Sequence, residues 1–400
     1  MNAPRDLPPA RLRPAQRAAR LKGSVIREIL KLTQGADVIS LAGGLPSPLS
    51  FPVPELRAAF DAVLRDDGAA ALQYSSTEGD ARLREWIAAR ETARGVPTTA
   101  DEVLIVAGSQ QALDLLGKAF AEPGAPLLVE APSYLGALQA FSVYEPTFRT
   151  LPTDDAGFDP RAIDAAVAAD ARLLYAMPNF QNPTGRTLSA ERRALLAQAA
   201  RDHDLWLVED DPYGELWYEQ APPPSLRAWA RERTIRLSSF SKVLAPGLRL
   251  GYVIAPAECI ELLERLKQAT DLCTATLTQR AAAQVLASGL MDTHLPRIRA
   301  LYAAQAQVML DALAEHMPPG VQWTRPTGGM FVWLQLPAAL DAMALLRPAI
   351  AHGVAFVPGE PFYALEPIRN TLRLSFVTVP AEKIRQGVAT LAGLIAEAAA

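Results

Sequence analysis

The residues best suited to covalent chemistry lie in one short stretch, SSFSK at positions 238–242, with Arg249 seven residues after its lysine. A lysine acts as a nucleophile only as the neutral amine, so it needs a position held out of bulk water. The apolar run 235–237, which precedes the stretch, is typical of a buried strand. Arg249 adds a permanent cation, and Ser239 and Ser241 add hydroxyl donors that suit a phosphate. The pattern favours a Schiff-base lysine beside a phosphate site; the alternative is a loop in which both cations are ordinary surface charges.

A second polar group stands between the apolar run 103–107 and a helical pattern. It consists of Ser109 and Gln110, which follow Gly108. Backbone N–H groups and a hydroxyl at a helix N-terminus form an anion site, so this group can hold the same phosphate. The plainer interpretation of Ser109 is a helix N-cap.

Two more polar groups follow strand-like runs, and both suit an aromatic ring that carries a nitrogen and a phenolic oxygen. Asn182 begins an Asn-Pro-Thr-Gly sequence and can donate to a phenolic oxygen, although an ordinary turn is the alternative. Asp210 is placed to keep a pyridine nitrogen protonated, and Tyr213 can bond the same phenolic oxygen. A helix cap is the alternative for Asp210. Because all four groups occur together, each after a strand-like run, we favour one shared site.

These polar groups follow short apolar runs that alternate with helical patterns from about residue 100 onward. The runs are 103–107, 127–129, 173–176, 205–208, 235–237 and 252–255. Short runs without polar alternation predict strands buried on both faces of a mostly parallel sheet, and stretches such as 190–202 predict the connecting helices. Ligands of such sheets bind at the carboxyl ends of the strands, where the polar groups stand.

The alternation stops near residue 295, which predicts a second and smaller unit. A helical pattern runs from His294 to His316, and predicted strands at 331–336, 354–357 and 371–376 and an Ala-rich helix follow. We therefore predict an α/β fold: a mostly parallel sheet sandwiched by helices, with a smaller α+β domain built from the N- and C-terminal segments. The predicted division is 1–60 for an N-terminal arm and part of the small domain, 61–295 for the large domain, and 296–400 for the C-terminal small domain.

Composition narrows the classes of protein. Of 400 residues, 50% are apolar and 20% are charged, a balance typical of a globular enzyme and not of a disordered chain. The net charge of -4 gives no electrostatic reason to expect a nucleic acid or an anionic membrane as partner. No run approaches the roughly 18 apolar residues of a membrane span. We expect neither kind of partner.

The N-terminal segment and the cysteines bear on the compartment. The first 22 residues carry six basic side chains against one acidic one, and no apolar core of a signal peptide follows. We expect a basic arm on a cytoplasmic protein; contact of the arm with nucleic acid is the alternative, although the arm lacks aromatic residues. Two cysteines, Cys259 and Cys273, exclude a disulfide framework and a cysteine-ligated metal site, and we expect both to be small buried hydrophobic residues.

Motifs of other catalytic classes are missing. The sequence has no G-x-S-x-G, H-E-x-x-H, Walker or G-x-G-x-x-G pattern. Its four histidines are widely separated. We therefore expect no metal site and no catalytic triad built on them.

The sequence resembles the fold-type I, pyridoxal-phosphate-dependent aminotransferases of class I/II. Within them it is most similar to the branch of bacterial 2-aminoadipate aminotransferases of lysine biosynthesis and mammalian kynurenine aminotransferases. The resemblance extends from about Ser24 to the C-terminus. Besides the groups above, it rests on IRE at 26–28, LAGGLP at 41–46, LQYS at 72–75, EAPSY at 130–134, TGGMFVW at 327–333 and LRLS at 372–375.

The resemblance implies a role for each matched residue around pyridoxal 5'-phosphate. Lys242 forms the Schiff base with the cofactor and later moves a proton between the substrate Cα and the cofactor C4′. Asp210 pairs with the pyridine nitrogen, Asn182 and Tyr213 bond the phenolic oxygen, and Tyr134 stacks on the ring. The residues implied at the phosphate are Ser109, Gln110, Ser239, Ser241 and Arg249, joined by Tyr74 from the neighbouring subunit of a homodimer with shared active sites.

On the substrate side, the resemblance implies that Arg373 binds the α-carboxylate with its forked guanidinium, a task that lysine does not perform equally well. Asn182 lies alongside, and Gly44 and Leu45 line the pocket. The sequence departs from the family pattern at 211–215, where no bulky residue directly follows the tyrosine. This departure alters the pocket wall and leaves the exact substrate open.

Arg27 lies on the N-terminal segment that the resemblance implies closes over the substrate. It projects off the apolar stripe formed by Ile26, Ile29 and Leu30. We favour a contact with the distal carboxylate of a C6 dicarboxylic substrate, from which Arg27 swings away when the substrate is apolar. The alternative is a solvated helix residue.

The predicted activity is ping-pong transfer of an amino group between an L-amino acid and a 2-oxo acid. Candidate donors are 2-aminoadipate, glutamate, leucine and aromatic amino acids including kynurenine. The alternatives are a broad aromatic and branched-chain aminotransferase, and a pyridoxal-phosphate lyase or decarboxylase that shares the same cofactor shell. A regulator that joins this fold to a helix-turn-helix domain is a further class, which we do not expect because the basic arm is too short for such a domain.

Overall fold

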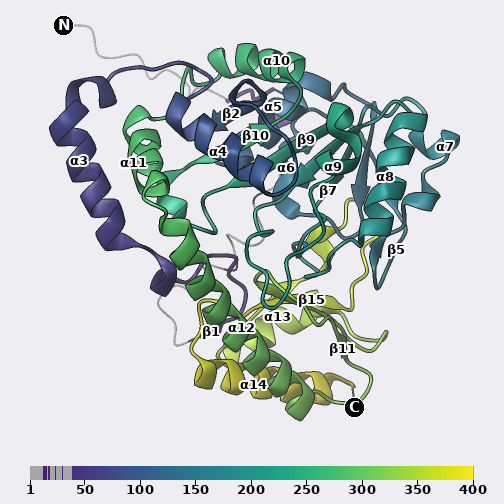
Figure 1. Cartoon of the computed structure of the whole chain (residues 1–400). Helices are drawn as coiled ribbons and strands as arrows, with labels where there is room; N and C mark the ends of the chain where they lie inside the picture. Colours follow the sequence, from purple (N-terminus) through teal and green to yellow (C-terminus); the bar gives the residue numbers. More distant parts are fainter. Residues whose placement is uncertain (1–11, 16, 19–22, 24–28, 30–37, 400) are drawn as a thin grey trace, which may run out of the picture.

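The computed structural model describes residues 12–15, 17–18, 23, 29 and 38–399. Its centre is a seven-stranded sheet (Figure 1). In spatial order the strands are β2 (Val103–Val106), β10 (Gly251–Ile254), β9 (Thr234–Ser239), β8 (Trp206–Asp210), β7 (Leu173–Ala176), β3 (Pro126–Glu130) and β4 (Thr147–Leu151). Neighbouring strands are parallel except β10, which is antiparallel to both of its neighbours. The predicted mostly parallel α/β sheet is confirmed.

Successive residues of the middle strands point to opposite faces of this sheet, and both faces are covered. Along β3, Leu127 and Val129 belong to the large hydrophobic core, which also contains residues of α5 (Ser109–Phe120) and α6 (Leu135–Ser142). Leu128 instead belongs to a smaller core beneath α8 (Ala190–Asp202). Burial on both faces explains why the strand runs are continuously apolar.

The connecting helices begin where the sequence supplies a cap. The Ser189 hydroxyl accepts from the backbone N–H of Arg192 at the start of α8, whose bounds match the predicted helix. The Asp164 carboxylate does the same for α7 (Ala165–Ala168). The other helices that follow strands of this sheet are α9 (Arg227–Ala230) and α10 (Ala257–Gln268).

A second, four-stranded antiparallel sheet lies below the first in Figure 1. Its order is β11 (Gln322–Trp323), β12 (Phe331–Gln335), β15 (Thr371–Ser375) and β14 (Val357–Pro358), and α13 (Ala342–Ala351) and α14 (Ala381–Ala399) accompany it. An early segment joins this region, because β1 (Ile39–Ser40) pairs in parallel with β13 (Val354–Ala355) and the Ser375 N–H donates to the Leu41 carbonyl. One large core includes residues of both sheets.

Long helices connect the two regions. The helix α3 (Val53–Ala71) packs along α11 (Thr276–Ala287), and α12 (Leu290–His316) runs from that pair down to α14 (Figure 1). The remaining α-helix of the described residues is α4 (Ala81–Ala93), and the remaining strands are β5 (Thr153–Asp154) and β6 (Gly157–Phe158), which form a small hairpin. The predicted limits at 60 and 295 therefore fall inside α3 and α12, and the division into domains stays a prediction.

Two details of the sequence prediction are wrong. The single strand predicted at 354–357 is two strands in different sheets, since β13 pairs with β1 and β14 pairs with β15. The chain changes partners at Phe356, whose side chain is fully buried between the two pairings. Cys259 is buried as expected, whereas Cys273 is only half-buried because it lies in the turn between α10 and α11.

No helix in the described part of the chain is long and apolar enough to cross a lipid bilayer.

Candidate active site

A cavity of about 830 Å³ opens at the carboxyl ends of the central strands. Every predicted site residue except Tyr74 and Arg27 lines it: Gly44, Leu45, Ser109, Gln110, Tyr134, Asn182, Asp210, Tyr213, Ser239, Ser241, Lys242, Arg249 and Arg373. The topology explains this gathering, because parallel strands bring their carboxyl ends to one edge of the sheet. Residues from both ends of the chain complete the wall.

Lys242 lies in the turn directly after β9 and reaches toward the early segment of the chain. Its Nζ donates to the Gly44 carbonyl at 2.8 Å. Burial lowers the pKa of Lys242 to about 8, and the positive charges of Arg373 and Arg249 act in the same direction. A substantial fraction of the amine is therefore neutral near pH 8, which is the state that a nucleophilic lysine needs.

Asp210 ends β8 and is 1% exposed. Its Oδ2 accepts from the Tyr175 hydroxyl at 2.7 Å, while its Oδ1 is buried without a hydrogen-bond partner among the described residues. Burial raises the pKa of Asp210 to about 7, and the neighbouring Asp211 contributes to the rise. A buried, unpartnered acceptor at the cavity wall suits a cationic N–H group of a ligand.

Arg373 in β15 is also nearly inaccessible, at 1% exposure. One Nη donates to Asn182 Oδ1 at 2.7 Å, and the other donates to the Ala42 carbonyl at 2.8 Å. Its guanidinium carbon lies 4.2 Å from the ring centroid of Phe331. The aromatic face and the two acceptors hold the fork in one orientation, which suits two-point binding of a carboxylate.

Tyr213 is 3% exposed and packs edge-on against Phe331, with ring centroids 5.8 Å apart. Burial raises the pKa of its hydroxyl, so the group remains a hydrogen-bond donor. The side chain of Asn182 lies near enough to this hydroxyl to lower its pKa, and it accepts a hydrogen bond from Arg373. Asn182 therefore links the predicted ring-binding and carboxylate-binding residues.

The part of the cavity predicted to bind the phosphate contains the N-terminus of a helix, and two backbone segments come close together there. The helix α5 begins at Ser109, and Gly108 before it has φ +85°, a conformation that side chains rarely adopt. A Cβ on Gly251 would lie 2.9 Å from the Gly108 backbone, so β10 must pass with no side chain. Arg249 donates to the Ala107 carbonyl at 3.2 Å, which places its guanidinium beside the helix start.

The two predicted serines are already oriented toward each other. The Ser239 hydroxyl donates to Ser241 Oγ at 2.9 Å and accepts from the Ser241 N–H at 3.1 Å. On another side of the cavity, the ring of Tyr134 lies so close to Gly136 that a Cβ there would come within 2.6 Å of the hydroxyl oxygen. Gln110 Nε2 donates to the Gly136 carbonyl at 3.1 Å and so joins α5 to the start of α6.

The donor set fits pyridoxal phosphate. The residues around the cavity supply a lysine with a lowered pKa, a buried carboxylate with one unpartnered oxygen, an anion site at a helix N-terminus and an arginine guanidinium. These groups match an aldehyde, a pyridine nitrogen, a phosphate and a substrate carboxylate in turn. The roles of the individual residues stay predictions.

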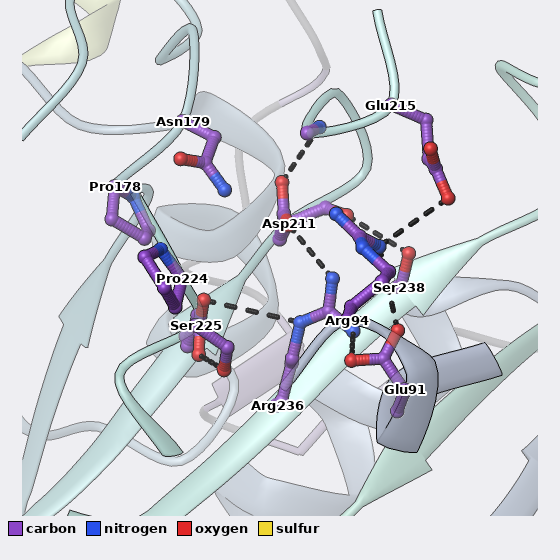
Figure 2. A network of polar contacts seen from close by, with 12 residues as sticks. Glu91, Arg94, Pro178, Asn179, Asp211, Glu215, Pro224, Ser225, Arg236 and Ser238 are labelled. Atoms are coloured by element: carbon purple, nitrogen blue, oxygen red, sulfur yellow. Dashed lines mark hydrogen bonds and ion pairs between the residues drawn. The ribbon is translucent and has the colours of Figure 1, made fainter. Parts of the chain in front are cut away.

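A buried network of charges that the motifs did not reveal includes Asp211, the residue after Asp210 (Figure 2). Its centre is Arg236 of β9, whose two Nη atoms lie 2.8 Å from Asp211 Oδ2 and 2.6 Å from Glu91 Oε2. Glu209 lies on the third side, 3.9 Å from the Arg236 Nε. These four side chains are at most 5% exposed, so each charge depends on the others.

The network continues to the helices outside the sheet (Figure 2). Arg94 bonds both Glu91 and Glu215, and Glu215 also accepts from Arg90 at 2.9 Å and from Arg299 of α12 at 3.3 Å. The network therefore links α4 and α12 to Arg236 of β9 and to Asp211, which follows β8. The available sequence signal was a charged residue, Arg236, within an otherwise apolar strand run.

Glu130 at the end of β3 is another buried acid that the motifs did not single out for chemistry. Its Oε2 accepts from the Met177 N–H at 3.0 Å. Burial raises the pKa of Glu130 to about 8, and the charge of Asp210 acts in the same direction. At neutral pH Glu130 is therefore mostly protonated.

Two predicted residues are not at the cavity of the single chain. Tyr74 is 76% exposed and does not line it. Arg27 lies outside the described residues, so its predicted contact with a distal carboxylate has no structural counterpart here. Leu45 does line the cavity, although 58% of it is exposed.

Similarity to known proteins extends over nearly the whole chain. The family model described as aminotransferase class I and II matches residues 36–391. An aromatic-amino-acid aminotransferase of Thermococcus litoralis is 44% identical over 394 residues, which cover 96% of this chain and 94% of that protein. A 2-aminoadipate transaminase of Thermus thermophilus is 46% identical over 383 residues, which cover 94% of each protein.

A solved structure gives the same picture. The α-aminoadipate aminotransferase from Thermus thermophilus, in complex with N-(5′-phosphopyridoxyl)-L-leucine, has a TM-score of 0.88 and 44% sequence identity to this chain. The likeness covers 96% of this chain and 97% of that one.

The lowered pKa of Lys242 predicts where and how fast pyridoxal phosphate attaches. Borohydride reduction of the loaded wild-type protein should label Lys242, and the rate of attachment to the cofactor-free protein should rise with pH and level off above about 8. Lys242→Ala should fold and bind the cofactor without label, and should lose transamination. Lys383→Ala, which alters an exposed lysine of α14, should be labelled as in the wild type. Label on any other lysine would falsify the assignment.

The raised pKa of Glu130 predicts a pH-dependent penalty in the cofactor-free protein. The folded state keeps this proton up to about pH 8, whereas an unfolded glutamate loses it near pH 4.3, so folding becomes less favourable as the pH rises between these values. Glu130→Gln has no such proton. Its free energy of unfolding relative to wild type should therefore increase from pH 5 to pH 8, by at most about 1.4 kcal/mol per pH unit.

Urea unfolding of both proteins at pH 5 and pH 8 measures this difference. An identical difference at the two pH values would mean that Glu130 is ionised throughout this range, contrary to the raised pKa.

Proposed function

The chain belongs to the class I and II aminotransferases, and from this membership we propose which amino acids it accepts and which residues act on them. The enzyme transfers an amino group between an L-amino acid and a 2-oxo acid, with pyridoxal phosphate as its cofactor. The observation that carries the assignment of residues is that Lys242, Arg373 and Asp210, whose Oδ1 has no partner among the described residues, all line one cavity.

The proposed donors are 2-aminoadipate and glutamate, with leucine and aromatic amino acids as further substrates. The names of two relatives support acidic and aromatic donors, since they are a 2-aminoadipate transaminase and an aromatic-amino-acid aminotransferase. Leucine is supported by the phosphopyridoxyl-leucine adduct in the solved relative. We also propose a cytoplasmic enzyme of amino-acid metabolism, which belongs to lysine biosynthesis if 2-aminoadipate is its physiological donor.

The proposed roles follow from the geometry of the chain's own residues. Pyridoxal phosphate, when bound, supplies an electron sink for negative charge at the substrate Cα. Arg373 binds the α-carboxylate, and its hydrogen bond to Asn182 fixes the orientation of the guanidinium that receives it. Lys242 would hold the cofactor covalently and, once released by the incoming amine, would take the proton from the substrate Cα and deliver it to the cofactor C4′. Its lowered pKa lets it act as a base near neutral pH.

The remaining assigned residues hold the cofactor. Asp210 keeps the pyridine nitrogen protonated through Oδ1, the oxygen that has no hydrogen-bond partner among the described residues. Tyr213 and Asn182 bond the phenolic oxygen. Tyr134 covers the ring. The residues that hold the phosphate are Ser109, Gln110, Ser239, Ser241 and Arg249. Gly44 and Leu45 form the substrate side of the wall.

A homodimer is the assembly that the exposed surface supports. Tyr74 is the last residue of the stretch 45–74, which carries six of the exposed large hydrophobic side chains. They are Leu45, Leu49, Val53, Leu64, Leu72 and Tyr74 itself. Apolar side chains gathered on one stretch are typical of an interface with another protein. A second copy of the chain would bury them and bring its Tyr74 to the phosphate site.

A mixing experiment tests this sharing of residues. Lys242→Ala and Tyr74→Ala should each be poorly active as pure proteins, the second because a phosphate contact is lost. In a mixed dimer, the site that keeps Lys242 receives an intact Tyr74 from the other chain, so the mixture should regain activity that neither parent has. No recovery, although two differently tagged chains co-purify as mixed dimers, would place Tyr74 and Lys242 in the same chain's site. A fully active monomer would rule out the shared site.

The assignment of Arg27 predicts a substrate-specific loss. A hydrogen bond between charged groups contributes roughly 1.5–3 kcal/mol, or on the order of 10- to 150-fold. Arg27→Ala should therefore lower kcat/KM for 2-aminoadipate and glutamate by about that factor and leave leucine within a few-fold. The lower end is favoured because holding a long side chain in one conformation at a binding site costs conformational entropy.

Half-reaction rates give the measurement. Each amino acid is mixed with the loaded enzyme, and the change in cofactor absorbance is followed for the wild type, Arg27→Ala and Arg373→Ala. Arg373→Ala should slow every substrate, because all share the α-carboxylate. Equal losses for acidic and apolar substrates in Arg27→Ala would show that Arg27 shapes the closing segment and does not bind the distal carboxylate.

A further inference from the structure

Tyr175, which no motif singled out, makes a direct contact with Asp210. The Tyr175 hydroxyl donates to Asp210 Oδ2 at 2.7 Å, and the two residues are 0% and 1% exposed. Tyr175 lies in β7 opposite Val208 of β8, two residues before Asp210. Residues two apart along a strand share a face, so both side chains project from the same side of the sheet.

The ring of Tyr175 has little freedom to move. It packs edge-on against Phe141 of α6, with centroids 5.8 Å apart and an interplanar angle of 72°. Burial and the charge of Asp210 raise the pKa of Tyr175 well above 10. The hydroxyl therefore stays protonated and acts as a permanent donor to the carboxylate.

This contact gives the two carboxylate oxygens of Asp210 different surroundings. Oδ2 is occupied by the tyrosine, whereas Oδ1 has no partner in the described part of the chain and belongs to a residue that lines the cavity. The torsion that turns a carboxylate is broad, so nothing in the aspartate itself fixes this orientation. Loss of the hydroxyl would leave both oxygens as buried acceptors without partners.

We propose that Tyr175 is a positioning residue for the cofactor: its hydroxyl holds the Asp210 carboxylate with Oδ1 toward the pyridine nitrogen and keeps that carboxylate ionised. Tyr175 acts through Asp210 and does not itself contact the cofactor. The proposal rests on the role of Asp210 proposed above, and its test separates the two.

The electrostatic part of the proposal concerns the groups around Asp210. Those whose charge or titration acts on it or responds to it are Tyr175 of β7, Asp211 directly after β8, Glu130 of β3, Tyr134 at the start of α6, and Tyr213. Among them, the Tyr175 hydrogen bond lowers the pKa of Asp210, whereas burial and Asp211 raise it. Removal of the hydroxyl should therefore shift the titration of Asp210 to higher pH.

The test compares pyridoxal phosphate affinity in five cofactor-free proteins, measured by equilibrium dialysis. They are the wild type, Tyr175→Phe, Asp210→Ala, the double variant and Tyr218→Phe. Tyr218 is the matched control, because its hydroxyl donates to the Gly329 carbonyl at 3.1 Å and it does not line the cavity. Tyr175→Phe should bind about tenfold more weakly, Asp210→Ala more weakly still, and Tyr218→Phe as the wild type does.

The double variant tells positioning from packing. If Tyr175 acts through Asp210, the double variant should bind no more weakly than Asp210→Ala alone. Additive losses would mean that Tyr175 only supports the core, and would overturn the proposal. If Asp210→Ala binds as the wild type does, the role of Asp210 itself is wrong; if only Asp210→Ala is impaired, the Tyr175 proposal alone fails.

A spectroscopic readout covers the case in which Tyr175→Phe does not fold. The 13C chemical shift of the Asp210 side-chain carboxyl group follows its titration in the cofactor-free protein. Placing 3-fluorotyrosine at position 175 keeps the ring but makes the hydroxyl a stronger donor. This should move the titration of Asp210 in the cofactor-free protein to lower pH, and an unchanged midpoint would overturn the proposal.

Discussion

Arg236 has a carboxylate on each of three sides and is the buried cation that these three acids share. It donates a hydrogen bond to Asp211, forms an ion pair with Glu91 and lies close to Glu209. Removing one partner of a buried charge pair typically costs about 3–5 kcal/mol, because the others are left uncompensated. Arg236 also lies in the strand that leads to Lys242, so the same residue supports the position of the acid at the ring and of the lysine.

Burial moves the two reactive groups of the cavity toward neutrality from opposite directions. It lowers the pKa of Lys242 to about 8 and raises the pKa of Asp210 to about 7. A dianionic phosphate near Arg249 and a protonated ring nitrogen near Asp210 would supply the opposite charge that each end of the cavity lacks. The protein thus prepares a site whose charges are balanced only when the cofactor is bound.

The sequence predicted the central sheet and the polar residues at its edge because both leave strong local signals. Short apolar runs identify buried strands, and a polar residue such as Asp210 at the end of a run is conspicuous. Tyr175 and Arg236 lie inside such runs, where periodicity shows only that they are buried; their partners come from neighbouring strands and a distant helix. The break at Phe356 was missed for the same reason, since a change of pairing partner is a long-range event.

The backbone approach at the phosphate end bears on how this enzyme can diverge. Gly251 passes against the backbone of Gly108, and no substitution there avoids a collision with main-chain atoms. Gly44, on the substrate side, meets no comparable restriction, because the atom nearest to a Cβ there is a side-chain carbon of Phe331 at 3.5 Å. Mutation can therefore explore the substrate wall freely while the cofactor end stays fixed. Descendants of this chain should differ first in the amino acids they prefer, and only much later, if at all, in the cofactor on which they rely.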